Sequence, residues 1–260
     1  MDYTLNNENP LKGTRQIEGK NPIIEALKSD VNIEKIMVAK GKRETGAQEL
    51  FDLAKDKKIK VQLVDRKKLD FTSQTGQHQG VIAIATEYEY SSIEEILENA
   101  SAKGESPFLV ILDKITDPHN FGAIIRTANA CGAHGIIIPK NRSVDISPVS
   151  VKASAGAIEY TSICKVTNLT QTIKDLKKQG LWIAGADIEG KKYYNNNLKG
   201  PMAIIIGNEG EGISRLVKEE CDFLISIPMY GDIESLNASV ATGIILSEVA
   251  RQRIESATRG

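Results

Sequence analysis

Asn120 and Arg126 are the first residues whose types could do chemistry, an amide and a guanidinium within LDKITDPHNFGAIIRTANA (112–130). Asp117 and Pro118 form a cap and first-turn pair that predicts a helix starting there. Arg126 follows Asn120 by six residues, nearly two helical turns, so we expect the two side chains to lie on roughly one face and to hold one substrate. The alternative is a capped helix with a surface arginine, which the spacing alone favours.

A glycine-rich turn that contains Glu209 follows an apolar strand pattern in IIIGNEGEGIS (204–214). Glycines there would let backbone N–H groups approach a ligand closely. The turn lacks both the GxxxxGK[ST] phosphate loop and the GxGxxG dinucleotide spacing, which argues against a nucleoside-triphosphate enzyme and against a nucleotide-cofactor oxidoreductase. The alternative is an ordinary strand-to-helix turn.

Ser235 and Asn237 begin an alanine-rich helix pattern in IPMYGDIESLNASVATGIILSE (227–248). Both residue types are good helix caps, so a structural role alone explains them. All three polar turns nevertheless follow predicted strands, and open parallel sheets bind ligands at the carboxyl ends of their strands. We therefore expect the three turns to meet at one end of a sheet.

The elements that would position these turns alternate between strand and helix patterns, which predicts an α/β fold with a parallel sheet in residues 107–260. The expected strands are 108–112, 135–139, 161–166, 181–186, 202–207 and 223–228, and the expected helices are 120–131, 147–155, 169–179, 213–219 and 237–256. Shorter units predict a small α/β domain at 16–86, with helices at 23–27 and 45–57 and strands at 33–39, 59–64 and 81–85. We expect a flexible arm at 1–15 and a linker around one helix at 87–106.

The formal charge of −1 on 260 residues gives no overall attraction to nucleic acid, so an RNA-binding surface must be local. The basic candidates all lie in the first domain and are Lys40, Lys42, Arg43, Arg66, Lys67 and Lys68, the last three ending a run that begins at Lys55. A solvated helix face or turn is the alternative for each cluster.

Three cysteines and three histidines are too scattered for a disulfide framework or a tetrahedral metal site. Cys131 and His134 have a CxxH spacing, but no second pair completes it, so we expect no metal. No apolar run reaches the roughly 18 residues of a membrane helix, and the N-terminus lacks a leader pattern. We therefore expect a cytoplasmic protein without a membrane partner.

The three segments, in this order, closely resemble the signature motifs of the SpoU (TrmH-like) RNA 2′-O-methyltransferases, within the SPOUT superfamily. The resemblance covers about 106–256, and IEGKNPIIEAL and HQGVIAIA within 16–86 resemble the substrate-binding domain of many members. It implies a C-terminal domain with a deep trefoil knot, an S-adenosylmethionine cofactor and a homodimer. The final helix would pack on its copy through an apolar face formed by Val240, Ile244, Ile245 and Val249.

By position, the resemblance implies cofactor contacts, largely through backbone groups, at Gly207, Ile227 and Leu236, with Asn208 and Met229 nearby. The residues on the family's catalytic and motif positions are Asn120, Arg126, Glu209, Ser235 and Asn237. Arg126 is the family's proposed base, yet a guanidinium is normally protonated, so we expect it to bind the target phosphate and to hydrogen-bond the emerging alkoxide. Asn120 and Glu209 would hold Arg126 or the ribose, and Asn237 would cap the site.

The segment SVKASAGAIEY (150–160) is more similar to the branch that methylates a guanosine in 23S ribosomal RNA than to the tRNA branch. Asp232 and Glu234 depart from the family pattern by making the 230–235 loop acidic, which leaves the target open. Methylation of tRNA is the runner-up, although that branch often lacks the N-terminal domain. A non-catalytic RNA-binding or ribosome-assembly module ranks third, because it would not need Arg126, Glu209 and Asn237 all intact.

Overall fold

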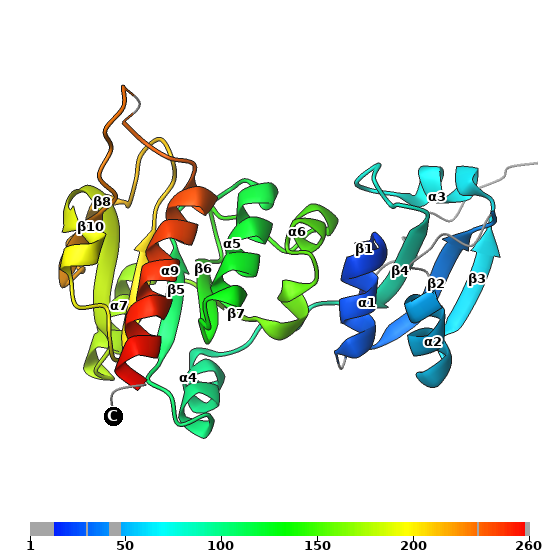
Figure 1. The fold of residues 1–260 in the computed structure, drawn as a ribbon, viewed down its shortest axis with the longest axis horizontal. Helices are drawn as coiled ribbons and strands as arrows, with labels where there is room; N and C mark the ends of the chain where they lie inside the picture. The colour runs from blue at the N-terminus through cyan, green and yellow to red at the C-terminus, as the bar shows by residue number, and fades with distance from the viewer. Residues whose placement is uncertain (1–12, 30, 42–47, 233, 258–260) are drawn as a thin grey trace, which may run out of the picture. The chain divides into compact units, whose positions relative to one another are not determined.

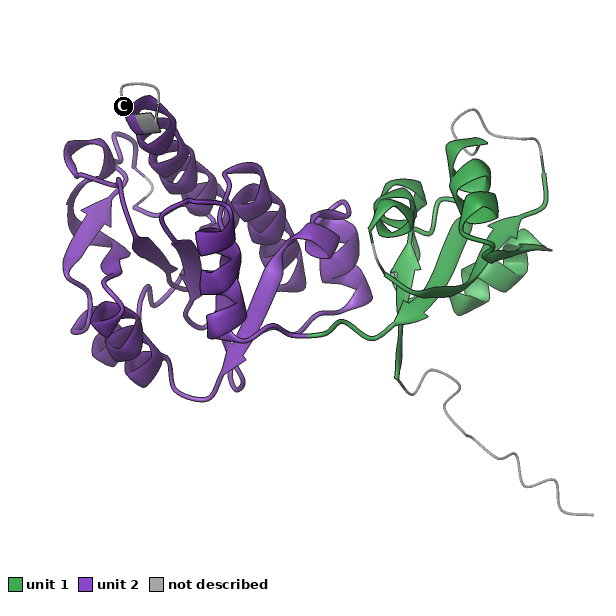
Figure 2. Cartoon of the chain, turned by 90° about the horizontal axis from the view of Figure 1, so that it is seen from below, with its two compact units in different colours: residues 1–89 green, residues 90–260 purple. Residues whose placement is uncertain are grey.

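The computed structural model describes residues 13–29, 31–41, 48–232 and 234–257. The chain divides into two compact units, residues 1–89 and residues 90–260, each with its own sheet (Figure 2). Among the described residues, no helix is both long enough and apolar enough to cross a membrane.

Unit 1, residues 1–89, is a small α/β domain (Figure 1). Its described elements are β1 (Thr14–Glu18), α1 (Lys20–Lys28), β2 (Ile33–Ala39), α2 (Gln48–Asp56), β3 (Lys60–Val64), α3 (Arg66–Thr72) and β4 (Val81–Thr86). The sheet order is β1-β4-β2-β3, in which β2 and β3 run parallel and the other two pairs are antiparallel.

Strand β1 and helix α3 are absent from the sequence prediction, and the reason for β1 is its polar composition. Glu18 of β1 is fully buried, and its carboxylate accepts hydrogen bonds from Ser73 Oγ at 2.6 Å and from the backbone N–H of Gln74 at 2.6 Å. Burial alone would raise the pKa of Glu18, but these bonds and those from Thr75 hold it below its ordinary value. A charged side chain therefore fixes the loop after α3 to the sheet.

Unit 2, residues 90–260, is built on a six-stranded, wholly parallel sheet of order β10-β8-β9-β5-β6-β7. Its strands are β5 (Phe108–Leu112), β6 (Gly135–Pro139), β7 (Ser162–Val166), β8 (Trp182–Lys192), β9 (Met202–Ile206) and β10 (Phe223–Ser226). Every residue of β5 and β9 is buried, as expected for central parallel strands that helices cover on both faces.

The helices of unit 2 are α4 (Ile93–Ala102), α5 (Pro118–Ala130), α6 (Pro148–Ala153), α7 (Leu169–Lys178), α8 (Arg215–Lys218) and α9 (Ala238–Ala257). Helix α4 lies within the segment expected as a linker. It begins with a capping box between Ser92 and Glu95, and its Ile96 is fully buried in a core cluster with α7 and the sheet. The structure thus places α4 in the core of unit 2.

Helix α9 packs beside α5 on one face of the sheet (Figure 1). Its buried side chains include Ile245 and Val249, whereas Val240 is 50% exposed. The prediction that Val240, Ile244, Ile245 and Val249 together form an interface with a second copy is therefore wrong for two of these residues. Ile245 and Val249 belong to the core of their own chain, and an apolar pattern alone does not distinguish the two environments.

Candidate active site

Asn120, Glu209 and Asn237 come from three separate segments and form one hydrogen-bonded cluster. The Asn120 amide donates to the Glu209 carboxylate, and Asn120 Oδ1 accepts from Asn237 Nδ2 at 2.8 Å. Glu209 Oε1 also accepts from the backbone N–H of Ala238 at 3.3 Å. The three turns therefore meet at the carboxyl ends of the neighbouring strands β5 and β9, as the sequence predicts.

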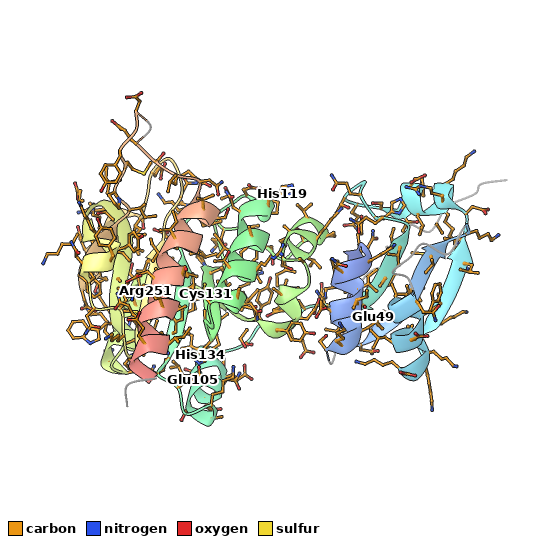
Figure 3. All side chains as sticks on the ribbon, viewed as in Figure 1. Glu49, Glu105, His119, Cys131, His134 and Arg251 are labelled. Carbon is orange, nitrogen blue, oxygen red and sulfur yellow. The ribbon has the colours of Figure 1, made fainter. Side chains whose placement is uncertain are left out.

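The first turn of α5 places Asn120 in this cluster, at the end of the helix that His119 marks in Figure 3. Asp117 caps the helix by accepting from the backbone N–H of His119 at 3.0 Å, and Pro118 occupies its first turn. Asn120 is only 8% exposed, so its amide needs partners inside the protein. Gly122 lets α5 lie directly on α6, because a Cβ there would lie 2.5 Å from the Ser150 carbonyl oxygen.

The loop that carries Glu209 is closed tightly on itself. A Cβ at Gly207 would lie 2.2 Å from the carbonyl carbon of Gly212, so no side chain fits at that position. Asn208 accepts from the Gly210 N–H through its side chain at 2.8 Å and from the Gly212 N–H through its carbonyl at 2.8 Å. Asn208 therefore shapes the loop from within, and the loop presents the Glu209 carboxylate.

Asn237 has both a structural and a site role. Its Oδ1 accepts from the backbone N–H groups of Ser239 at 2.9 Å and Val240 at 3.3 Å, which caps α9, while its Nδ2 reaches Asn120. The Glu209 carboxylate lies at the same helix N-terminus, where the helix dipole favours negative charge. Ser235 is exposed and lies two residues before this cap.

Arg126 does not share a face with Asn120, and that expectation is wrong. Residues six apart on an α-helix are separated by about 120° around its axis, because each residue advances about 100°. Asn120 accordingly faces Glu209, while Arg126 is exposed. Within the described part of the chain, no hydrogen bond or ion pair of the Arg126 guanidinium is found.

The five positions expected at the cofactor are all half-buried, namely Gly207, Asn208, Ile227, Met229 and Leu236. They lie after β9, after β10 and before α9, and the end of β8 lies between β9 and β10. The loop at Gly207, which has no room for a Cβ, and the half-buried apolar side chains of Ile227, Met229 and Leu236 fit a ligand that is held largely through backbone groups.

Sequence reasoning missed the far end of β8. The strand continues to Lys192 rather than ending at 186, and its pairing with β10 jumps from Gly185 to Lys191. The intervening residues 186–190 bulge out at the same end of the sheet as the three turns. The polar and glycine residues of DIEG (187–190) directly after an apolar strand are the signal that could have identified this fourth segment.

The CxxH pair has a structural explanation. His134 is buried, its Nδ1 accepts from the backbone N–H of Phe108 at 3.0 Å, and its Nε2 lies 3.1 Å from Glu105 (Figure 3). Burial lowers the pKa of His134, and Glu105 opposes this, while burial raises the pKa of the Cys131 thiol. The described residues contain no group of three or more His, Cys, Asp and Glu side chains that could hold a metal ion.

The basic residues expected at RNA lie on unit 1. Lys40 is exposed beside Asp65, with 3.6 Å between Nζ and Oδ1, and α3 carries the exposed side chains of Arg66, Lys67 and Lys68. Lys42 and Arg43 lie outside the described residues. An exposed pair such as Lys40 and Asp65 is weak in water, so it leaves most of the attraction of Lys40 for an anion intact.

Fold and site together define a class of protein. Residues 107–247 match the model of the SpoU rRNA methylase family, and residues 16–91 match that of the RNA 2′-O ribose methyltransferase substrate-binding domain. The chain therefore belongs to the SpoU rRNA methylase family.

Relatives span nearly the whole chain. A protein of Bacillus subtilis, YacO, named provisionally as a TrmH-family tRNA/rRNA methyltransferase, is 48% identical over 238 residues, 90% of this chain and 94% of its own. A Staphylococcus aureus protein with the same provisional family name is 44% identical over 239 residues, 91% of this chain and 96% of its own.

Solved structures show the same likeness. The SpoU methyltransferase AviRb of Streptomyces viridochromogenes, in complex with the cofactor AdoMet, has a TM-score of 0.77 at 26% identity and covers 97% of this chain and 95% of its own. The A. aeolicus TrmH/SpoU tRNA-modifying enzyme has a TM-score of 0.54 at 32% identity and covers 63% of this chain and 85% of its own.

Proposed function

We propose that this protein transfers a methyl group from S-adenosylmethionine to the ribose 2′-hydroxyl of a guanosine in 23S ribosomal RNA. The observation that carries the proposal is the Asn120–Glu209–Asn237 cluster, in which three distant motifs of an RNA methylase family meet at one end of the sheet. Bound AdoMet in AviRb and in an rRNA methyltransferase of Sinorhizobium meliloti, each 26% identical, supports the cofactor.

S-adenosylmethionine supplies an electrophilic methyl group when it is bound. Backbone groups at Gly207, Ile227 and Leu236 would hold it, with Asn208 and Met229 beside them. The tight closure of the loop at Gly207 supports this, because a fixed loop presents its backbone groups in one arrangement. The ribose hydroxyl is a weak acid, so holding it in line with the methyl group accounts for much of the acceleration.

In this proposal Arg126 approaches the target nucleotide from the exposed side of α5, about 120° around that helix from Asn120, and there binds its phosphate and hydrogen-bonds the developing alkoxide. Its exposure, and the lack of a partner among the described residues, support a role toward a ligand rather than toward the fold. Asn120 and Glu209 position the ribose, and Asn237 fixes Asn120 from the start of α9. Ser235 borders the same opening.

The N-terminal unit supports an rRNA target over tRNA. The rRNA methyltransferase of S. meliloti covers 92% of this chain, whereas the tRNA-modifying enzyme of A. aeolicus covers 63%. Unit 1 contributes RNA affinity through Lys40, Lys42, Arg43, Arg66, Lys67 and Lys68. Mapping 2′-O-methyl groups in total RNA from cells with and without this gene decides the target. Loss of a tRNA methyl group instead would establish the runner-up.

The proposal includes a homodimer, a trefoil knot in the C-terminal unit and action in the cytoplasm, where the RNA is. The half-exposed Val240 of α9 supports the dimer, since an apolar side chain is available there. Light scattering on the full chain tests the dimer.

The Arg126→Ala variant tests the catalytic role. We expect single-turnover methyl transfer to fall by roughly two to four orders of magnitude, the range for losing a positioned acid, base or oxyanion donor. S-adenosylmethionine affinity by calorimetry should hardly change. Arg126→Lys should restore little, because lysine keeps the charge but not the planar fork. Arg215→Ala, at an exposed arginine of α8, is the control and should keep full transfer. Wild-type turnover in Arg126→Ala would show that the role is wrong.

A further inference from the structure

Unit 1 contains a hollow of about 1080 Å³ that is lined by side chains of α2, β2 and β3 and by the first residues of α1 and α3. The hollow lies at the carboxyl end of β2, where the chain leaves the sheet at Lys40 and Gly41. Its volume is slightly above the range of about 300–1,000 Å³ that is typical of ligand pockets. None of the Asn120–Glu209–Asn237 cluster lines it.

The charge around this hollow is strongly positive although the whole chain carries a formal charge of −1. Its cationic side chains are Lys20, Lys40, Lys55 and Arg66, and Asp52 is the one carboxylate among the described lining residues, while Asp65 lies 3.6 Å from Lys40 Nζ at its rim. Lys55 and Arg66 are exposed and form no ion pair with the other described residues. Lys40 from one basic cluster and Lys55 and Arg66 from the other thus line one concave surface that suits a phosphate.

The hollow also has an apolar wall. Leu63, on the edge strand β3, is 58% exposed, and Phe51 of α2 is half-buried and also lines the hollow. Apolar side chains that are open to solvent next to cations suit a ligand that is flat and apolar at one end and anionic at the other. Nucleotides have that chemistry, since a base stacks on an aromatic ring while the phosphate meets Lys or Arg.

We infer that this hollow holds an unpaired nucleotide of the RNA substrate, with its base against Phe51 and Leu63 and its phosphates at Lys55 and Arg66. The inference rests on the proposed function for RNA as the ligand. The nucleotide must be unpaired, because in an RNA duplex neighbouring bases cover both faces of each base, and only an unstacked base can lie against a side chain such as Phe51. Unit 1 therefore selects a single-stranded or bulged element of the RNA substrate.

A matched pair of charge-reversal variants of the full chain tests the inference. Lys55→Glu combined with Arg66→Glu changes the hollow, while Lys35→Glu combined with Lys60→Glu makes the same charge change at exposed partners on β2 and β3 outside it. Fluorescence anisotropy measures binding of a mixed-sequence, 12-nucleotide single-stranded RNA and of its duplex over a range of salt.

We expect the hollow variant to bind the single strand at least tenfold more weakly and the control less than threefold. The slope of log affinity against log salt should fall by about 1.4 in the hollow variant, at about 0.7 for each lost phosphate contact on a single strand. Leu63→Ser should weaken single-strand binding without changing that slope and should leave duplex binding unaltered. Leu63 is already exposed, so its replacement does not threaten the fold.

Equal losses in the two double variants, equal losses for single strand and duplex, or no binding of the single strand by the wild type would each overturn the inference. Methyl transfer and S-adenosylmethionine affinity are measured on the same proteins. A wild type that methylates RNA while the hollow variant binds it normally defeats this inference alone. A wild type that binds the single strand through the hollow but transfers no methyl group defeats the proposed function alone.

Discussion

Replacing Asn120 by aspartate tests the hydrogen-bonded cluster with an almost isosteric change. Asn120 now donates to the Glu209 carboxylate and accepts from Asn237. An aspartate can still accept from Asn237, but it has no proton to donate and sets a second carboxylate against Glu209. The variant therefore keeps the shape of the site and reverses one interaction within it.

The expected cost follows from this geometry. Two unit charges about 4 Å apart repel by about 4 kcal/mol at an effective dielectric constant of about 20. Glu209 is exposed on one side, so water and salt should remove about half of that, leaving ~2 kcal/mol. The lost hydrogen bond adds ~1 kcal/mol. We expect Asn120→Asp to lower the free energy of unfolding of the chain by ~3 kcal/mol at pH 8 and to abolish most methyl transfer.

Urea denaturation at pH 8 and pH 5, together with single-turnover methyl transfer, measures both effects. The penalty should shrink at pH 5, because a proton shared by the two carboxyl groups removes their repulsion. Asn168→Asp is the control, since Asn168 caps α7 as an acceptor only and aspartate caps equally well. If Asn120→Asp unfolds and transfers like the wild type at pH 8, the cluster does not position the site.

Two further changes test the packing around the fold. Gly122→Ala should destabilise the protein by about 1–3 kcal/mol, measured by denaturant unfolding, because its Cβ would lie 2.5 Å from Ala153 Cβ and from the Ser150 carbonyl oxygen; an unchanged midpoint would contradict the close contact of α5 and α6. The folded-state pKa of Glu18 is lowered. Its contribution to the free energy of unfolding is therefore fully present at pH values above its ordinary pKa of 4.5 and is lost as the pH falls through the lowered pKa. Glu18→Gln should cost about 1–3 kcal/mol at pH 7 and flatten the dependence of stability on pH below 5, and a variant with the wild-type pH profile would refute this.

Some elements of this fold can be predicted from their own residues, whereas others depend on partners that are distant in the sequence. The strands β5 and β6 are continuous apolar runs, so their bounds follow directly from the sequence. The sequence TRQIE does not predict strand β1, because buried Gln16 and Glu18, besides bonding each other, need partners from residues more than fifty positions later. Buried polar residues whose hydrogen-bond partners lie in a distant loop have the same sequence pattern as surface residues, so the sequence alone does not identify them as buried.

The candidate site divides in the same way. The meeting of Asn120, Glu209 and Asn237 follows from the rule that parallel strands present their carboxyl ends together. The direction of Arg126 also follows from helix geometry. Each residue advances about 100° around the axis, so a residue six positions after Asn120 cannot lie on the same face, and the sequence prediction did not take that angle into account. The hollow of unit 1 could not be predicted, because its cations come from three helices and from the residue after β2, which only the folded domain brings together.

The order of strands in unit 2 also constrains how the molecule is made. Strand β9 lies between β8 and β5, yet it is synthesised after both of them. Until residue 206 has left the ribosome, β5 has an open edge and β8 has no place in the sheet, so the growing chain carries unpaired apolar strands. Assembly of this sheet therefore cannot be completed before β9 has emerged, and chains cut short before β9 are exposed to aggregation rather than partly active.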